Sequence, residues 1–495
     1  MLTYFPNYFS RRAILCYAIT LALVSVLFMN HILPLKFVVF GFVAVILFFT
    51  FASKLTMKWG RCPEHVYQRR VFFTALVIRL IYVVFIYFYY ISETEIPHAY
   101  HAGDELLYHN TAATWFESGY EDFRNSIHDY IDFSDSGYCW WLALMYLPFG
   151  PHVLAGRVVK CIIDAFTCLL LYNLGKRNFG ESVGRIAAIF YMLIPNAWFY
   201  CGVTLKEIEM TFLVVLFVER ADSALHSSKL KIQSFILPLM ASAAMLTFRT
   251  AMAAVMVASL GLTFVIGAQK HLQVWQKIVL GIVFAVWMFM TVGVELLEES
   301  AQLWANRTTN QETGYAWRSE TNSFAQYASA AVFAPLIFTI PFSSMVDIFS
   351  QENQMMMNGA NFIKNILSGL TIFALFMLLK RREWRNHVLP LALMGGYLVV
   401  LVFSNFAHSE RFHFPVLAFE LLFAAYGVSQ LTNKHKRLYM IWMVGICVAN
   451  VLWAWIKLAG RGLSGEYLLL LRSTKAILHP SLSNRSRHLK SKAAQ

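Results

Sequence analysis

Long apolar stretches, separated by short polar segments, make up most of the chain. They have roughly the length of a transmembrane helix and lie at 13–30, 35–53, 71–91, 153–174, 184–203, 207–221, 233–248, 250–268, 278–297, 361–379, 388–406, 412–430 and 438–457. Hydrophobic residues make up 58% of the 495 positions and charged residues only 14%, a balance that soluble globular proteins do not tolerate. The pattern predicts an all-α polytopic membrane protein, a bundle of about 13 transmembrane helices.

The net charge of +13 comes largely from basic clusters between the apolar stretches. Such clusters mark the cytoplasmic side of a membrane protein, so the charge does not indicate binding of nucleic acid. They lie at 11–12, 54–70, 176–177, 229–231, 270–277, 380–382 and 434–437. This places the loops 92–152 and 298–360 on the outer side and the C-terminus outside. The basic residues between 472 and 492 favour the inner side for the tail, and the sequence leaves this conflict open.

The first outer loop is the most acidic part of the chain. Ser92 to Tyr138 holds ten of the 28 carboxylates. The apolar segment 138–149 that follows is too short to cross the ~30 Å core of a bilayer, so we expect a helix lying in the interface. The chain then divides into an N-terminal hairpin with its cytoplasmic connection (1–70), a transmembrane core (71–430), and a last helix with a basic tail (431–495).

Few ionisable residues are expected at the outer ends of the helices. They are Asp104, Glu105, Lys206, Glu207, Arg249, Glu410 and Arg411, with His413 close by. Ionisable groups at membrane depth are costly, so each is a candidate for a site. A carboxylate can act as a general base on a hydroxyl, and Arg or Lys can neutralise a departing phosphate. The alternatives are solvated loop acids, a local Lys–Glu ion pair, and arginines that extend to the interface.

Other residues also allow more than one interpretation. Arg79, inside the 71–91 stretch, either extends to the nearby headgroups or faces a polar interior. No cofactor is certain, but Asp104 and Glu207 would be the ligands if a divalent cation, Mg²⁺ or Mn²⁺, is used. Three histidines early in the outer loop are more often simply polar than zinc ligands: His98, His101 and His109.

The order of these motifs resembles the GT-C superfamily of polyprenyl-phosphate-sugar-dependent glycosyltransferases. It is most similar to the branch of protein O-mannosyltransferases, aminoarabinose transferases and RgtA/B/C/D-like proteins. The resemblance covers 71–430 and departs from many members in lacking Lys-Pro-Pro before the interface helix. The matching elements are Arg79, Gly103-Asp104-Glu105-Leu106-Leu107-Tyr108, Ser136-Gly137-Tyr138, Ile194-Pro195-Asn196, Leu205-Lys206-Glu207, Phe248-Arg249-Thr250 and Glu410-Arg411-Phe412-His413.

The resemblance implies an inverting transfer of a sugar from a polyprenyl phosphate to an acceptor hydroxyl. Asp104 would be the general base, with Glu105 beside it. The donor phosphate would be bound by Lys206, Arg249 and Arg411. The acceptor, or a cation, would be held by Glu207, Tyr108 and His413.

The same resemblance implies the partners and the location. The partners would be the lipid-linked donor, the bilayer, and a glycan, lipid or protein acceptor, with no nucleic acid. The location would be the inner (plasma) membrane of a bacterium, with the site facing the periplasm. The alternatives are an O-antigen polymerase or ligase type of enzyme and a transporter or flippase for lipid-linked sugars.

Overall fold

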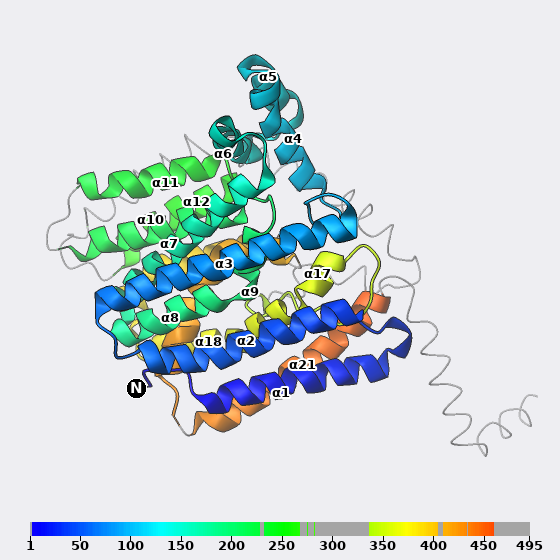
Figure 1. The fold of residues 1–495 in the computed structure, drawn as a ribbon. Helices are drawn as coiled ribbons and strands as arrows, with labels where there is room; N and C mark the ends of the chain where they lie inside the picture. Colours follow the sequence, from blue (N-terminus) through cyan, green and yellow to red (C-terminus); the bar gives the residue numbers. More distant parts are fainter. Residues whose placement is uncertain are drawn as a thin grey trace, which may run out of the picture.

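A computed structural model describes residues 2–227, 232–267, 336–403, 409–432 and 434–459, with the isolated positions 275 and 282 (Figure 1). Within these ranges the regular elements are all helices. Seven of them are long and apolar enough to cross a membrane: α1 (Asn7–Leu27), α2 (Leu35–Trp59), α3 (Glu64–Thr94), α18 (Asn358–Lys380), α19 (Val388–Phe403, with the short turn before it), α20 (Glu410–Ser429) and α21 (His435–Ala459). The all-helical polytopic fold is thus confirmed. The number of crossings stays a prediction, and the 278–297 stretch lies outside the described residues except for position 282.

The remaining helices fill the space between these seven and lead into the outer loops. The bundle also contains α7 (Val153–Phe179), α8 (Glu181–Leu193), α9 (Pro195–Cys201), α10 (Glu207–His226), α11 (Ile236–Leu246) and α12 (Thr250–Ile266), and the short α17 (Glu352–Met356) precedes α18. α7 packs against α3, α8 and α10, whereas α20 packs against α18, α8 and α10. α7 and α20 therefore share α8 and α10 as neighbours.

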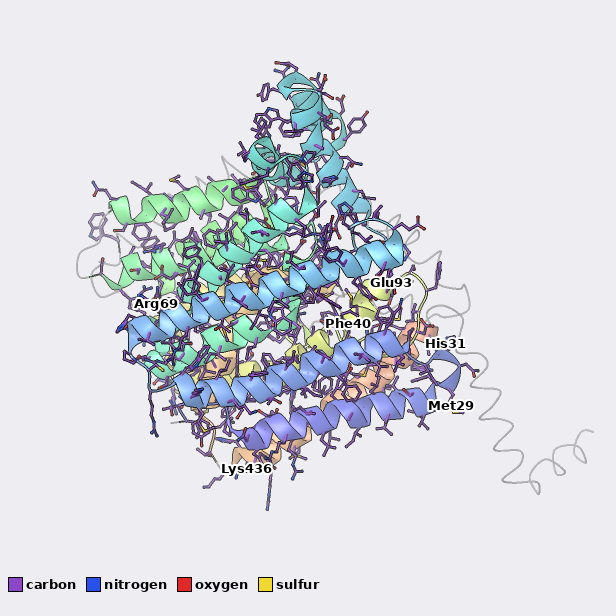
Figure 2. The ribbon with its side chains drawn as sticks, viewed as in Figure 1. Met29, His31, Phe40, Arg69, Glu93 and Lys436 are labelled. Carbon is purple, nitrogen blue, oxygen red and sulfur yellow. The ribbon has the colours of Figure 1, made fainter. Side chains whose placement is uncertain are left out.

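Labelled charged residues mark the two ends of the bundle. Figure 2 shows Arg69 and Lys436 at one end and Glu93 at the other. α21 runs from the first end to the second, where Lys457 donates to Gln351 at 2.9 Å. Arg69 and Lys436 belong to two of the predicted cytoplasmic clusters and lie at the same end, whereas the side of the membrane that each end faces stays a prediction. The basic tail lies outside the described residues.

The sequence predicted one continuous span at 184–203, and this prediction is wrong. The structure has two helices there, α8 and α9. α9 begins at Pro195, whose ring nitrogen has no hydrogen to continue the helical ladder. The carbonyls of Tyr191 and Met192 accept instead from Arg79 Nη2 and Nη1, at 3.3 and 3.2 Å. Backbone groups inside a membrane protein need such partners, because no water replaces them.

Arg79 is fully buried and belongs to the interior of the bundle. Its Nε donates to Asp164 of α7, and the other oxygen of that carboxylate accepts from the Tyr191 hydroxyl at 2.5 Å. The alternative in which Arg79 extends to the headgroups is therefore wrong, and the residue faces a polar interior. Two buried charges persist only when they are paired and hydrogen-bonded, and this pair connects α3, α7 and α8.

Close contact between helices depends on glycine at two crossings. A Cβ atom on Gly175 of α7 would lie 2.7 Å from Gly184 Cα in α8, and one on Gly359 of α18 would lie 2.8 Å from Gly41 Cα in α2. Small residues let helix backbones approach closely, which is how helices pack when lipid removes the hydrophobic driving force. The second crossing attaches the N-terminal hairpin, which the family resemblance does not cover, to the core.

The first outer loop forms three helices at the top of Figure 1, of which α5 lies farthest from the bundle. They are α4 (Gly103–Glu117), α5 (Tyr120–Tyr130) and α6 (Phe133–Phe149). Trp115 of α4 stacks on Phe123 of α5 and meets Trp140 of α6 edge-on, with ring centroids 5.0 and 5.4 Å apart. α6 starts earlier than the predicted 138–149 helix and packs on α4 and α7, in agreement with a segment that does not cross the bundle.

Replacing Arg79 by Met should destabilise the protein strongly. The change leaves the Asp164 carboxylate buried without its cation, and breaking a buried pair in this way costs about 3–5 kcal/mol. Thermal unfolding of the detergent-solubilised protein should show a large drop in Tm. The double variant Arg79→Met with Asp164→Leu should recover much of the loss, because no unpaired charge remains. An Arg79→Met variant that unfolds at the wild-type temperature would show that the pair does not support the bundle.

Candidate active site

The start of α4 gives two neighbouring carboxylates different surroundings. The chain enters α4 just after His101, whose φ of 52° is unusual for a residue other than glycine. Asp104 and Glu105 follow in the first turn, where the helix dipole favours negative charge. The Asp104 side chain is 57% exposed, whereas Glu105 is only 2% exposed. Two residues that are adjacent in the sequence therefore have different chemical roles available to them.

Arg411 connects three helices through two carboxylates. It lies in the first turn of α20, its Nη1 donates to Asp104 Oδ2, and its Nε donates to Glu207 Oε1 at the start of α10. Glu207 is 2% exposed, and its second oxygen, Oε2, has no hydrogen-bond partner among the described residues. The three predicted residues thus come together as one ion-paired unit, and one buried acceptor in it is left for a ligand or for water.

Lys206 lies beside this unit, and its ammonium already has three acceptors. It donates to Asp135 Oδ1, to the Ser134 carbonyl at 3.0 Å, and to the Phe248 carbonyl. Burial, together with the charge of Arg249, lowers the pKa of Lys206 to about 8, although Asp135 opposes the shift. Because an ammonium has three donors, the arrangement makes Lys206 a connection between α6, α10 and the turn before α12.

The remaining predicted residues lie around this centre. The Tyr108 hydroxyl donates to Asp135 Oδ2 at 2.6 Å. Burial raises the pKa of the Asp135 carboxyl, but Lys206 outweighs it and the net shift is downward. Arg249 lies over the Phe412 ring, 4.3 Å from its centroid. The last predicted residue, His413, is buried within α20.

A polar cavity of about 300 Å³ lies beside Asp104. Its walls come from the start of α4, from α9, from α17 and from the start of α20, and include Asp104, Arg411, Glu410, Tyr200, Asn353 and Met357. Glu410, another predicted residue, accepts from Asn196 Nδ2 at 2.5 Å, directly after the break at Pro195. Carboxylates and a guanidinium therefore line a cavity large enough for part of a sugar phosphate.

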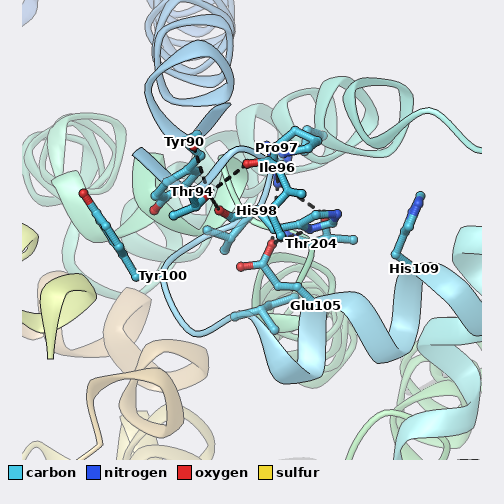
Figure 3. Close-up of polar contacts among 12 residues, drawn as sticks. Tyr90, Thr94, Ile96, Pro97, His98, Tyr100, Glu105, His109 and Thr204 are labelled. Atoms are coloured by element: carbon cyan, nitrogen blue, oxygen red, sulfur yellow. Dashed lines mark hydrogen bonds and ion pairs between the residues drawn. The ribbon is translucent and has the colours of Figure 1, made fainter. Parts of the chain in front are cut away.

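Three groups contact Oε2 of the Glu105 carboxylate, and Figure 3 shows two of the residues that supply them, His98 and Thr204. They are the backbone N–H of Thr204 at 2.9 Å, His98 Nδ1 at 3.4 Å and Arg157 Nη2 at 3.5 Å. Burial alone would raise the pKa of Glu105, but His98, Arg157 and the Thr204 N–H stabilise the charged form and lower it. These contacts make Glu105 an anchor that fixes α4 to the segment before α10.

Two buried cations of α7, Arg157 and Lys160, support the site but were not predicted from the sequence. Arg157 is 1% exposed and donates to the Pro97 carbonyl at 2.6 Å. Lys160 is 1% exposed and donates to the carbonyls of Val203 (2.9 Å) and Leu205. Arg157 also donates to Thr204 Oγ1 at 3.4 Å, so both residues contact the segment that leads to Lys206 and Glu207. The signal was present, because positions 157, 160 and 164 repeat with the spacing of one helix face inside a stretch treated as apolar.

The histidines and carboxylates do not converge as metal ligands. His101 contacts Glu352 at 2.9 Å, His109 contacts the Tyr146 hydroxyl at 2.9 Å, and His98 contacts Glu105. In the part of the chain that the structure describes, no three His, Cys, Asp or Glu side chains form a metal-binding group. The guanidinium of Arg411 stands between Asp104 and Glu207, so a divalent cation bridging them would have to displace it.

Fold and site together define a helical membrane protein with an ion-paired polar pocket. Residues 325–461 match the family model of the Alg9-like mannosyltransferases, which supports the prediction of a GT-C glycosyltransferase although it covers less than half of the chain. The chain is also similar to a crystal structure of ArnT from Cupriavidus metallidurans bound to undecaprenyl phosphate, with 12% identity and a TM-score of 0.44 over 75% of this chain. It spans 63% of the length of that protein. A search of curated proteins finds no match.

Neutralising Glu105 should destabilise the protein far more than neutralising Asp104. Glu105→Gln removes the negative charge beside buried Arg157, so the Tm should fall by many degrees. Asp104→Asn affects an exposed ion pair worth about 0–1 kcal/mol, so the Tm should change little. Thermal unfolding of the two variants in the same detergent makes the comparison. Equal unfolding temperatures for wild type and Glu105→Gln would contradict the anchoring role.

Proposed function

We propose that the protein is a membrane glycosyltransferase that moves a sugar from a polyprenyl-phosphate-linked donor to an acceptor hydroxyl at the outer face of the membrane. The observation that carries the proposal is that two cavities of different character lie next to each other. The polar cavity beside Asp104 and a long apolar groove share two wall residues, Phe199 and Met357. Such a site suits a molecule with a long hydrocarbon chain and a charged, hydroxyl-rich head.

The apolar groove has a volume of about 930 Å³ and runs between α2 and α3. Figure 2 shows Phe40, one of its lining residues, between these helices. Its lining is almost entirely apolar and also includes Val43, Leu47, Ile81 and Trp198. Lys36, which is ion-paired with Glu93, stands at the end of the groove nearest the outer loop. A polyprenyl chain in this groove would bring its phosphate toward Arg411.

The reaction follows from the position of Asp104. The carboxylate takes the proton of the acceptor hydroxyl, and the acceptor oxygen forms a bond to the anomeric carbon. The bond from that carbon to the phosphate oxygen breaks, and its electron pair leaves with the polyprenyl phosphate. Attack from the face opposite the phosphate inverts the configuration. Arg411, with Arg249 nearby, compensates the negative charge that develops on the leaving phosphate.

The ion pair between Arg411 and Asp104 suggests how the base becomes available. A donor phosphate would compete with Asp104 for the same guanidinium nitrogen, Nη1. Binding of the donor would then release the carboxylate toward the acceptor. Glu207 would keep Arg411 oriented through Nε during this exchange. Because the donors of Lys206 are occupied, we assign it to holding Asp135 and the turn before α12, and we do not place it in contact with the phosphate.

The variant Asp104→Asn should lower sugar transfer by at least about a hundredfold, because a base of this kind contributes 10²–10⁴. The assay follows radiolabelled mannose from polyprenyl phosphate mannose into membranes that supply the acceptor. Mannose is the first choice because the matched family consists of mannosyltransferases. Pooled lipid-linked sugars from native membranes are the second donor.

The matched control for this variant is Asp129→Asn in α5. The Asp129 side chain is 59% exposed, close to the 57% of Asp104, and it contacts the neighbouring His128. This control should transfer sugar at the wild-type rate. Near-wild-type transfer by Asp104→Asn would remove Asp104 from the mechanism.

Narrowing the apolar groove should weaken use of the long-chain donor selectively. Ala44 lines the groove, and Ala44→Trp would displace part of the hydrocarbon chain. Loss of about two buried methylene groups corresponds to an increase of about tenfold in apparent KM. A donor with a shortened chain should show little change. Val26→Trp on the exposed face of α1 is the control, and an unchanged KM for the long-chain donor in Ala44→Trp would place the chain elsewhere.

A further inference from the structure

A second apolar groove lies on a different side of the bundle, between α18 and α21. Its volume is about 630 Å³, and none of its lining residues lines the groove or the polar cavity beside Asp104. The indole of Trp442 forms part of its wall and donates to the Asn365 carbonyl at 3.1 Å. A Cβ atom on Gly369 would lie 2.5 Å from the same indole nitrogen, so the ring rests against the α18 backbone. The wall is therefore fixed by packing and by a hydrogen bond.

Both walls of this groove end in basic residues at the same end of the bundle. On α18 the lining positions are Gly369, Ile372, Phe373 and Phe376, and on α21 they are His435, Leu438, Ile441, Trp442 and Gly445. Lys380 follows Phe376 by four residues, and Arg437 precedes Ile441 by four, so each continues the stripe of its own helix. Both side chains are exposed, as is that of Lys434. Because α18 ends where α21 begins, these cations gather at one mouth of the groove.

We infer that this groove binds an anionic phospholipid, with an acyl chain along α18 and α21 and the phosphate at Lys380 and Arg437. An apolar groove alone would accept any hydrocarbon chain, whereas the cations at its mouth select a headgroup with net negative charge. Basic pockets between transmembrane helices are a recognised setting for such headgroups. The basic end is the one predicted to face the cytoplasm, where anionic lipids favour clusters of Lys and Arg.

Lipid binding by the purified, delipidated full-length protein tests this inference. Phosphatidylglycerol should raise the Tm in a saturable manner, and phosphatidylcholine with the same acyl chains should not. In the double variant Lys380→Gln with Arg437→Gln, the apparent affinity for phosphatidylglycerol should fall by about thirtyfold, from the contribution of two surface cations. The double variant Lys54→Gln with Lys58→Gln removes two exposed cations from the same end of α2 and should bind like wild type.

A second pair of variants separates the groove from general surface charge. A Cβ atom on Gly445 meets no heavy atom within 4 Å, so Gly445→Phe fills the groove without disturbing the helix. Val444, its neighbour on α21, is 61% exposed and outside the groove, which makes Val444→Phe the control. Phosphatidylglycerol should stabilise Val444→Phe like wild type and Gly445→Phe much less.

Three results would overturn the inference. They are equal stabilisation of wild type by both lipids, unchanged affinity in the Lys380 and Arg437 double variant, and wild-type lipid response in Gly445→Phe. None of these variants touches Asp104, Arg411 or the groove between α2 and α3. The lipid measurement also needs no sugar transfer, so its outcome is independent of the proposed transferase function.

Discussion

The break between α8 and α9 is the constraint on which the rest of the site depends. A proline at position 195 cannot continue the helix, so backbone carbonyls are freed in the middle of an apolar bundle. Arg79 satisfies them, and this places a cation in the interior that in turn requires Asp164. The break also directs Asn196 toward Glu410. One backbone interruption thus fixes the relative positions of α3, α7, α8 and α20, and α20 carries Arg411.

The polar site is built at the starts of helices, where charged groups are least costly. Asp104 and Glu207 lie in first turns and face the positive ends of their own helix dipoles. Arg411 lies in a first turn as well, where a cation is disfavoured by the dipole, and the two carboxylates compensate for this. Arg157 and Lys160 of α7 hold the segments that carry these groups. The buried ion pairs therefore give the loop residues a rigid support without taking part in the chemistry.

Sequence patterning predicted most of the helices and much of the convergence, for physical reasons. Apolar length alone predicts a helix in lipid, and the alternation of basic clusters brings distant residues such as Asp104, Glu207 and Arg411 to one end. The separation of Asp104 from Glu105 could not be predicted, because it depends on how α4 is rotated against α7. Arg157 and Lys160 were not predicted because the stretch 153–174 is apolar on average. Their spacing nevertheless places both on one face of the helix. The role of Pro195 could not be predicted either, because the sequence does not show that the carbonyls of Tyr191 and Met192 lie beside Arg79.

α18 is the element that the two grooves have in common. Its first half provides Ala360 to the groove beside α3, and Asn361 there accepts weakly from Asn196 at 3.4 Å. Its second half forms a wall of the groove beside α21. An occupant of the second groove would therefore pack against the same helix that contributes Ala360 to the first groove. Between the two grooves α18 is held by α2 and α20, which both pack against it.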